Sequence, residues 1–333
     1  MIKFGIVGMG IRGKLFANTL KENPYAEVVA VCDSNPDSLK SACETYQVKG
    51  YSTHEEMFAA GGLDAAIIAT PDFLHKDAVI CAAKHVKNIM IEKPLSTSVA
   101  ECEEMCEAIQ KNNVRCLIAF ENRWNLGFLA IKNRIEAGAT GDILQMNATL
   151  RNTLYVPTKM LTWAGQSTAA WFLFPHIVDM SLWLSGKTPK RVYANGSKKK
   201  LKGMGIDTYD AIQSIVTFTD GTSAQYNTCW VLPEGMPVIA DMKFELIGEK
   251  DSIFVDMSPQ CVQQVGQRFD FMRILGTPMN GHLNAGPHHM LHAFVDNIRL
   301  DTPVCANEMD GLVNTKIIAA VHESMRTGNV IDL

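Results

Sequence analysis

The sequence lacks the features that mark several large classes of protein. Its nine cysteines include no C-x-x-C pair, and the two nearest, Cys102 and Cys106, lie one helical turn apart. An odd number without a framework spacing favours free thiols in a reducing cytosol over a disulfide scaffold. No uninterrupted apolar run reaches transmembrane length, and no signal-peptide pattern precedes the first apolar segment. We therefore expect a cytoplasmic protein with no membrane partner.

An excess of charge of either sign is also missing. The 31 Lys and Arg residues nearly balance the 35 Asp and Glu residues, and the formal net charge is −4. Nucleic acids and anionic membranes attract proteins with a basic excess, so this balance argues against both partners. The 333 residues are enough for two domains. A small molecule is the expected ligand.

The first thirteen residues carry the strongest pattern that is present. An apolar run at residues 2–7 suits a buried strand, and Gly8, Gly10 and Gly13 follow at G-x-G-x-x-G spacing before an apolar helical face. Gly8 permits a tight turn, Gly10 lets the backbone approach a pyrophosphate, and Gly13 lets helix and strand pack closely. The free N–H groups of such a helix face the phosphates. The pattern predicts a dinucleotide site that also includes Met9, Ile11 and Arg12.

An acidic residue completes this pattern. A second apolar strand at residues 27–32 ends at Asp33, which lies 20 residues after Gly13. A carboxylate there accepts hydrogen bonds from both hydroxyls of the adenosine ribose and repels a 2′-phosphate, which favours NAD over NADP. Arg12 is near enough in sequence to weaken this preference without reversing it. The alternative is a structural βαβ unit with an acid there by chance.

Strands and helices alternate up to residue 120. Further apolar strands are expected at residues 64–69, 88–91 and 114–120, with helices between them. This alternation predicts a doubly wound parallel sheet, in which ligands bind beyond the carboxyl ends of the strands. Five candidate cofactor residues follow such ends: Gly8, Asp33, Thr70, Glu92 and Asn122.

The pattern changes after residue 140. Strands are expected at residues 143–153, 191–197, 211–219, 223–231, 241–246 and 252–256. Asp220-Gly221 predicts a hairpin, so this sheet is expected to be large, open and mostly antiparallel. One helix interrupts the strands, with Pro175 at its first position and Gly186 just past its end, and two helices close the chain near residues 288–300 and 308–327.

Longer motifs resemble the Gfo/Idh/MocA oxidoreductases, the relatives of glucose–fructose oxidoreductase and inositol dehydrogenase. The resemblance spans nearly the whole chain and rests on GIVGMGIRG, VCDSNP, IIATPDFLH, IEKP, the NR at positions 122–123, the GDI at 141–143 and HIVDMSLWLSG. It implies an NAD-binding Rossmann domain at residues 1–121 and an α+β substrate and oligomerisation domain at residues 122–333. Whether the C-terminal helices pack back on the Rossmann domain stays open. The family implies oxidation of sugars, cyclitols or related polyols without a metal.

The resemblance also implies roles for single residues. Lys93 matches the family's catalytic lysine beside the nicotinamide, and His176 matches its catalytic histidine. The cofactor-lining residues that match are Thr70, Pro71, His75 and Glu92, the last near the nicotinamide ribose, and Pro94 follows a peptide that is often cis.

One position departs from the family. Many members carry an Asp four residues before the histidine, whereas this chain has Phe172, which can neither transfer a proton nor bind a hydroxyl. Three alternatives follow: Lys93 and His176 suffice, Asp179 contributes, or the usual dehydrogenation is impaired.

The chemistry of an alcohol oxidation suits these residues. His176, expected at a helix N-terminus where the dipole keeps it neutral, is the candidate base, and a cationic Lys93 would stabilise the developing alkoxide. Asp179 is either a substrate contact or a structural hydrogen-bond acceptor. Tyr155 and Lys159 are expected in a loop and are candidate substrate contacts.

Other residues receive structural roles. His288, His289 and His292 lack the carboxylate or cysteine partners of a metal site, so capping or packing is expected and no metal is predicted. Tryptophans 163, 171 and 230 are expected to anchor the core rather than stack on a sugar.

The leading prediction is an NAD-dependent dehydrogenase of a sugar, sugar derivative or cyclitol. The alternatives are an NAD-dependent glycosidase that oxidises its substrate transiently, and a non-catalytic sensor of a dinucleotide or sugar. An uncovered apolar face is expected on the second domain's sheet, which predicts a homodimer or homotetramer assembled through that sheet.

Overall fold

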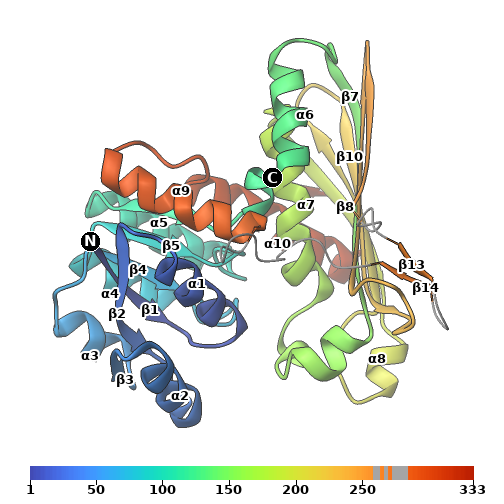
Figure 1. The fold of residues 1–333 in the computed structure, drawn as a ribbon. Helices are drawn as coiled ribbons and strands as arrows, with labels where there is room; N and C mark the ends of the chain where they lie inside the picture. The colour runs from blue at the N-terminus through green and yellow to red at the C-terminus, as the bar shows by residue number, and fades with distance from the viewer. Residues whose placement is uncertain (258–262, 266–268, 272–283) are drawn as a thin grey trace. The chain divides into compact units, whose positions relative to one another are not determined.

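The computed structural model describes residues 1–257, 263–265, 269–271 and 284–333 (Figure 1). The first unit holds the described residues of Met1–Trp124 and Pro278–Thr315, and the second holds those of Asn125–Thr277 and Lys316–Leu333. The boundary expected after residue 121 and the division after Trp124 both fall in one 3₁₀ turn, Glu121–Trp124. All cysteines that the structure describes are free thiols.

The first unit is built on a parallel six-stranded sheet with the order β3-β2-β1-β4-β5-β6. This confirms the predicted doubly wound sheet. Its strands are β1 (Ile2–Val7), β2 (Ala26–Cys32), β3 (Lys49–Tyr51), β4 (Ala65–Ile68), β5 (Asn88–Ile91) and β6 (Arg115–Ile118). Its helices are α1 (Ile11–Lys21), α2 (Pro36–Tyr46), α3 (His54–Ala59), α4 (Lys76–His85), α5 (Val99–Lys111) and α9 (Gly286–Leu300), and the first part of α10 (Glu308–Thr327) joins them.

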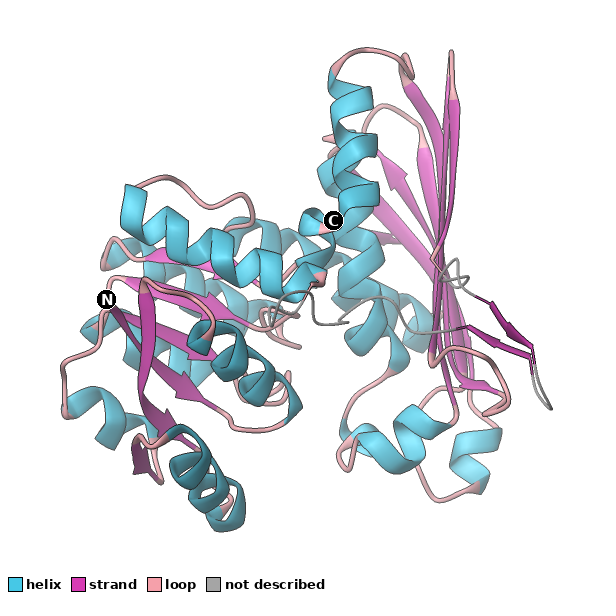
Figure 2. Cartoon of the chain, in the orientation of Figure 1, coloured by secondary structure: helices cyan, strands magenta, loops and turns pink. Residues whose placement is uncertain are grey.

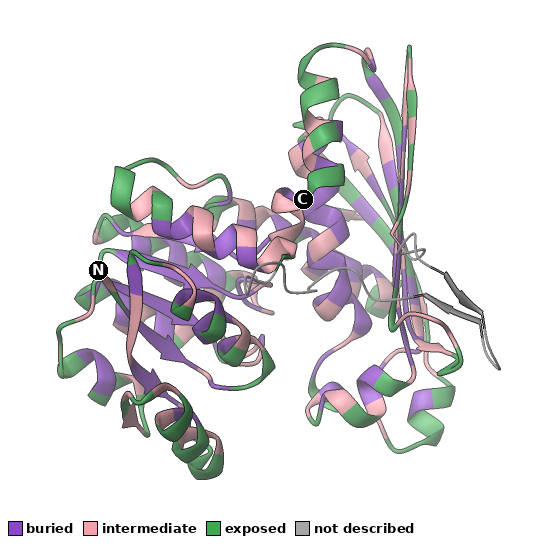
Figure 3. Ribbon diagram, viewed as in Figure 1, coloured by how far each residue is buried: buried purple, intermediate pink, exposed green. Residues whose placement is uncertain are grey.

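Helices cover both faces of this sheet, which explains why its central strands are mostly apolar (Figure 2). Every residue of β4 and β5 is buried (Figure 3). Helices α3, α4 and α5 pack in succession, while α1 packs on α9. Helix α2 begins after an asparagine N-cap: the Asn35 side chain accepts from the backbone N–H groups of Asp37 and Ser38, each at 3.0 Å.

The second unit is built on a seven-stranded sheet with the order β12-β11-β7-β10-β9-β8-β15. Only the β7–β10 pair is parallel, which confirms the mostly antiparallel sheet. Its strands are β7 (Ile143–Thr153), β8 (Pro189–Ser197), β9 (Ala211–Phe218), β10 (Ser223–Leu232), β11 (Ala240–Gly248), β12 (Ser252–Asp256) and β15 (Ile331–Asp332). The predicted hairpin joins β9 to β10, with φ of +89° at Gly221. A separate two-stranded antiparallel sheet pairs β13 (Gln263–Val265) with β14 (Phe269–Phe271).

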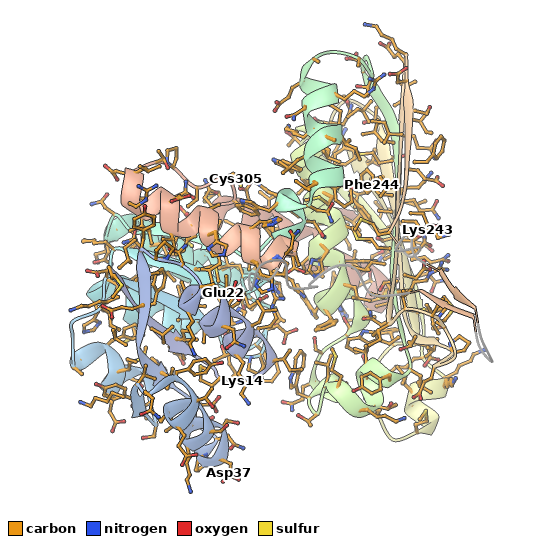
Figure 4. The ribbon with its side chains drawn as sticks, viewed as in Figure 1. Lys14, Glu22, Asp37, Lys243, Phe244 and Cys305 are labelled. Atoms are coloured by element: carbon orange, nitrogen blue, oxygen red, sulfur yellow. The ribbon has the colours of Figure 1, made fainter. Side chains whose placement is uncertain are left out.

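One face of this sheet packs on helices, and the other is largely polar. Phe244 on β11 contacts Phe128 of α6 (Leu126–Glu136), with ring centroids 5.9 Å apart, while its neighbour Lys243 lies on the opposite side of the strand (Figure 4). The outward positions include Gln145, Asn147, Gln213, Gln225 and Asn227, with Tyr193, Ile215 and Phe254 exposed among them. The expectation of an apolar outward face is therefore wrong, because period-2 patterning places mainly uncharged polar residues there.

Helix α7 (Ala169–Ser185) begins six residues earlier than expected. Thr168 is its N-cap and accepts a hydrogen bond from the Trp171 N–H at 3.2 Å, so Pro175 lies inside the helix and the prediction that Pro175 opens it is wrong. A proline at that place lacks the N–H that would bond the carbonyl four residues earlier, and its ring crowds that carbonyl. The buried, apolar helix nevertheless continues to Ser185. His176 is consequently not at the helix N-terminus. The dipole acts mainly within the first turn, so it does not hold His176 neutral.

Candidate active site

The glycine turn after β1 has the close contacts that a dinucleotide site needs. Gly8 has φ of +92°, and a Cβ atom there would lie 2.7 Å from the carbonyl oxygen of Ala69. A Cβ atom at Gly13 would lie only 1.9 Å from the carbonyl oxygen of Gly8. At Gly10 a Cβ atom would meet no protein atom within 4 Å. Close packing thus explains why glycine is needed at positions 8 and 13. The open side of Gly10 leaves room for a pyrophosphate to approach the backbone.

Asp33 is fixed beside this turn. Its Oδ2 accepts from the Met9 N–H at 2.7 Å, and its Oδ1 accepts from the Asn35 N–H at 2.8 Å. Each oxygen keeps lone-pair capacity that ribose hydroxyls can use. Met9 contributes its backbone to this arrangement while its side chain is buried, and Ile11 is 66% exposed. The residues present therefore fit the adenosine half of NAD.

His75 connects two loops at the same edge of the sheet. Its ring is 1% exposed, with Nδ1 3.0 Å from the Pro94 carbonyl oxygen and Nε2 3.0 Å from the Thr70 carbonyl oxygen. These contacts tie the segment after β4, with Thr70 and Pro71, to the segment after β5. His75 therefore supports the edge and offers almost no surface to a ligand.

Lys93 follows β5, and its peptide bond to Pro94 is cis. The side chain is partly buried. Burial is the largest influence on the ammonium group and lowers the pKa of Lys93, outweighing the Glu92 carboxylate, which raises it; Arg12 acts in the lowering direction. A lysine with a lowered pKa exchanges a proton near neutral pH more readily than an exposed one.

Arg12 bridges two carboxylates at this edge. Its Nε donates to Glu92 Oε1 at 2.5 Å, and its Nη2 donates to Glu121 Oε2 at 2.6 Å. Glu121 was not among the candidates from the sequence, although it follows an apolar strand closely, as Asp33 and Glu92 do. Asn122 lies next to it and is partly buried. Because two carboxylates balance the charge of Arg12, the guanidinium does not offset the preference of Asp33 for NAD.

In the second unit, α7 carries the remaining catalytic candidates. Phe172, His176 and Asp179 are spaced by four and three residues and share one face of the helix. His176 is partly exposed, whereas Asp179 is 2% exposed.

Aromatic rings surround Phe172. Its ring centroid lies 6.2 Å from that of Trp163 and 5.9 Å from that of Trp230. Trp230 is fully buried, and the buried Trp171 stacks on His322 at 4.8 Å. Trp171 and Trp230 thus pack in the core, as the sequence indicated.

The loop expected around Tyr155 and Lys159 is instead a turn of π-helix, Val156–Met160, which contains Lys159 and follows Tyr155 as its N-cap. Tyr155 is 39% exposed, and the Lys159 ammonium lies 6.0 Å from the centre of its ring. Lys159 also forms an ion pair with Glu234 at 3.1 Å. Their contact with a substrate stays a prediction.

The C-terminal histidines have structural partners. His288 Nδ1 is 2.5 Å from Thr19 Oγ1, and His292 Nδ1 is 2.8 Å from Asn23 Nδ2. Among the residues that the structure describes, no group of three His, Cys, Asp or Glu side chains is arranged to hold a metal ion. Within the same described ranges, no helix combines the length and the hydropathy needed to cross a membrane.

Comparisons with known proteins find a matching family model in each of the two units. A family model described as "Oxidoreductase family, NAD-binding Rossmann fold" matches residues 2–120, and one described as "GFO/IDH/MocA C-terminal domain" matches residues 128–254. The chain is 24% identical over 341 residues to scyllo-inositol 2-dehydrogenase (NAD(+)) of Bacillus subtilis, covering 100% of this chain and 96% of that protein. It is 26% identical over 257 residues to myo-inositol 2-dehydrogenase of Thermotoga maritima, covering 77% and 75%. An uncharacterized oxidoreductase of Streptococcus pneumoniae is 32% identical over 206 residues, covering 61% of this chain and only 55% of that protein.

Solved structures share the fold over the whole chain. Scyllo-inositol dehydrogenase from Lactobacillus casei, solved with NAD(H) and scyllo-inositol, has a TM-score of 0.85 at 20% identity and covers 100% of this chain and 99% of that one. A probable dehydrogenase from Thermotoga maritima has a TM-score of 0.83 at 22% identity and covers 99% and 98%. At these identities the likeness shows the fold alone.

Proposed function

Because the chain belongs to the Gfo/Idh/MocA family of oxidoreductases, we propose that it is an NAD-dependent dehydrogenase that oxidises one hydroxyl of a cyclitol, sugar or sugar derivative to a ketone. Its first unit is the NAD-binding Rossmann domain of that family. The names of relatives, which include myo-inositol 2-dehydrogenase and scyllo-inositol 2-dehydrogenase (NAD(+)), support a polyol substrate. The observation that carries the proposal is Lys93, a partly buried lysine on the sheet edge that also presents the glycine turn and Asp33.

In the proposed reaction, the substrate loses a proton from its hydroxyl oxygen and a hydride from its carbinol carbon. NAD, when bound, accepts the hydride from the carbinol carbon. Lys93 orients the hydroxyl and stabilises negative charge on its oxygen, and His176 accepts the hydroxyl proton. The lowered pKa of Lys93 also lets it share in this proton transfer.

Phe172 motivates a second candidate function. The family resemblance implies an acid at this place in many members, whereas this chain has Phe172, whose ring contacts Trp163 and Trp230. One relative, from Escherichia coli, is named 2,7-anhydro-N-acetylneuraminate hydratase and is 27% identical over 263 residues, covering 77% of this chain and 68% of that protein. A reaction in which oxidation is transient, as in an NAD-dependent glycosidase, is therefore the alternative.

A screen of sugars and cyclitols with NAD separates these functions. Net NADH formation with a polyol supports the dehydrogenase. Sugar release or water addition without net NADH supports transient oxidation. Tight NAD binding without turnover of any compound supports a sensor.

Substitutions then test the catalytic residues with the substrate in hand. Lys93→Met and His176→Ala should each lower turnover about 10²–10⁴-fold with little change in NAD affinity. The double variant should lose less than the product of the two effects, because the residues act as a unit. Lys87→Met is the matched control: Lys87 precedes β5 at its opposite end, where its ammonium donates to the Asn112 carbonyl at 2.9 Å. Near-normal turnover in Lys93→Met would remove the proposed mechanism.

A further inference from the structure

Arg12 lies at the glycine turn, where an arginine would ordinarily be expected to bind the phosphates of a dinucleotide. Its contacts are instead with two carboxylates. Both of its acidic partners follow strands on one side of the turn, Glu92 after β5 and Glu121 after β6. In the strand order, β4 separates β1 from β5, so Arg12 reaches from α1 past the end of β4. Its guanidinium also lies 4.9 Å from the centre of the Phe16 ring.

The order of these carboxylates along the carboxyl-end edge of the sheet indicates which half of NAD each of them would meet. Asp33 follows β2, on the other side of the glycine turn. A dinucleotide lies across this edge with its pyrophosphate at the turn and its adenosine ribose on the acid after β2. Its second half therefore extends over β4 toward β5, where Glu92 lies.

Glu92 is held on both oxygens. Oε1 accepts from Arg12 Nε at 2.5 Å, and Oε2 accepts from the Lys93 N–H at 3.1 Å. The residue is only 5% exposed. A buried carboxylate needs a partner that balances its charge and fixes its position, and Arg12 contacts both Glu92 and Glu121.

We propose that Arg12 is a positioning residue that clamps Glu92 and Glu121, so that Glu92 is fixed to bind the nicotinamide half of NAD, and that Arg12 does not bind the pyrophosphate. Two paired carboxylates leave the guanidinium little net charge to attract a phosphate. The inference depends on the proposed function only for which half of NAD reacts. Its test measures binding and needs no substrate.

Calorimetric titration of the full chain with NAD and with ADP is the test. ADP carries the adenosine ribose and two phosphates but lacks the nicotinamide half. Arg12→Met should raise the dissociation constant for NAD about tenfold, the scale of a lost hydrogen bond to a charged group, and leave that for ADP unchanged. Glu121→Gln should act in the same direction with a smaller effect. The double variant should bind NAD no more weakly than Arg12→Met alone, because Glu121 acts only through Arg12.

Arg115→Met is the matched control. Arg115 forms an equivalent pair with Asp301 at 2.5 Å and a hydrogen bond to Asn88 at 2.9 Å, but at the opposite ends of β5 and β6. It should change neither affinity.

Three results would overturn the proposal: equal weakening of ADP and NAD by Arg12→Met, unchanged NAD binding in both Arg12→Met and Glu121→Gln, or independent effects in the double variant. Should Arg12→Met fail to fold, Glu121→Gln still gives the comparison of NAD with ADP. If Arg12→Met selectively weakens NAD binding but the protein oxidises no polyol, the proposed function is refuted while the proposed role of Arg12 is supported.

Discussion

Two alanine substitutions in one turn should have opposite effects on folding, because the two glycines face different surroundings. Gly10 has φ of −73° and ψ of −155°, an extended conformation that alanine adopts, and its Cβ atom would meet no protein atom within 4 Å. Gly13 lies inside α1, and its Cβ atom would overlap the Gly8 carbonyl oxygen at 1.9 Å.

The magnitudes follow from these contacts. Gly10→Ala should leave stability unchanged or raise it by about 0.4–1 kcal/mol, because alanine restricts the unfolded chain. Gly13→Ala gains about 1 kcal/mol of helix propensity. The overlap costs more, about 1–3 kcal/mol or above, because the obstacle is backbone and α1 must shift as a body. Both variants should bind NAD at least about tenfold more weakly, Gly10→Ala because its methyl group blocks the pyrophosphate.

Thermal unfolding without NAD and NAD titration, measured on both variants, give the result. Only Gly13→Ala should unfold at a lower temperature than the unchanged protein. Wild-type NAD affinity in Gly10→Ala would show that the dinucleotide does not cross this glycine. A Gly13→Ala protein as stable as the original would refute the contact between α1 and the turn.

Three further predictions concern cofactor choice, pH and assembly. NAD should bind better than NADP, and Asp33→Ala should narrow that difference in titrations with both cofactors. Burial lowers the pKa of His322 in the folded chain below its usual value of 6.5, so the unfolded chain binds the proton more readily; stability should be complete above about pH 6.5 and fall as the pH drops below it. Denaturant unfolding across this range should show a smaller fall in His322→Gln, and an equal fall would exclude His322 as a cause. Although the outward face of the large sheet is mainly polar, Tyr193, Ile215 and Phe254 are exposed on it, and the chain should form a homodimer or homotetramer through this face. Ile215→Arg should shift light scattering toward the monomer; a monomeric unchanged protein at micromolar concentration would contradict this.

Local patterns predicted most of the fold because the interactions that set it are local. The strand bounds at residues 88–91 and 143–153 match β5 and β7. Period-2 and period-3.6 patterns need only neighbouring residues. Helix α7 was misplaced because a proline indicates a helix start more often than a tolerated interior position. The edge strand β15 is two residues long and too short to show a period.

The arrangement around Lys93 could be predicted only in part. Strand-end positions bring Asp33, Glu92 and Lys93 to one edge, because parallel strands share their carboxyl ends. The Arg12–Glu121 hydrogen bond joins residues that are 109 apart in sequence, and no rule of sequence spacing predicts it. Burial of His75 between two loops is likewise a product of tertiary packing.

The central claim is that this chain transfers a hydride from a polyol carbon to NAD with net oxidation. The most direct measurement uses the first polyol found by the screen, deuterated at the carbon that becomes the ketone, and follows both products. The account predicts deuterated NADH in amounts equal to the ketone. Product formation without net NADH, or NADH without deuterium, would contradict it.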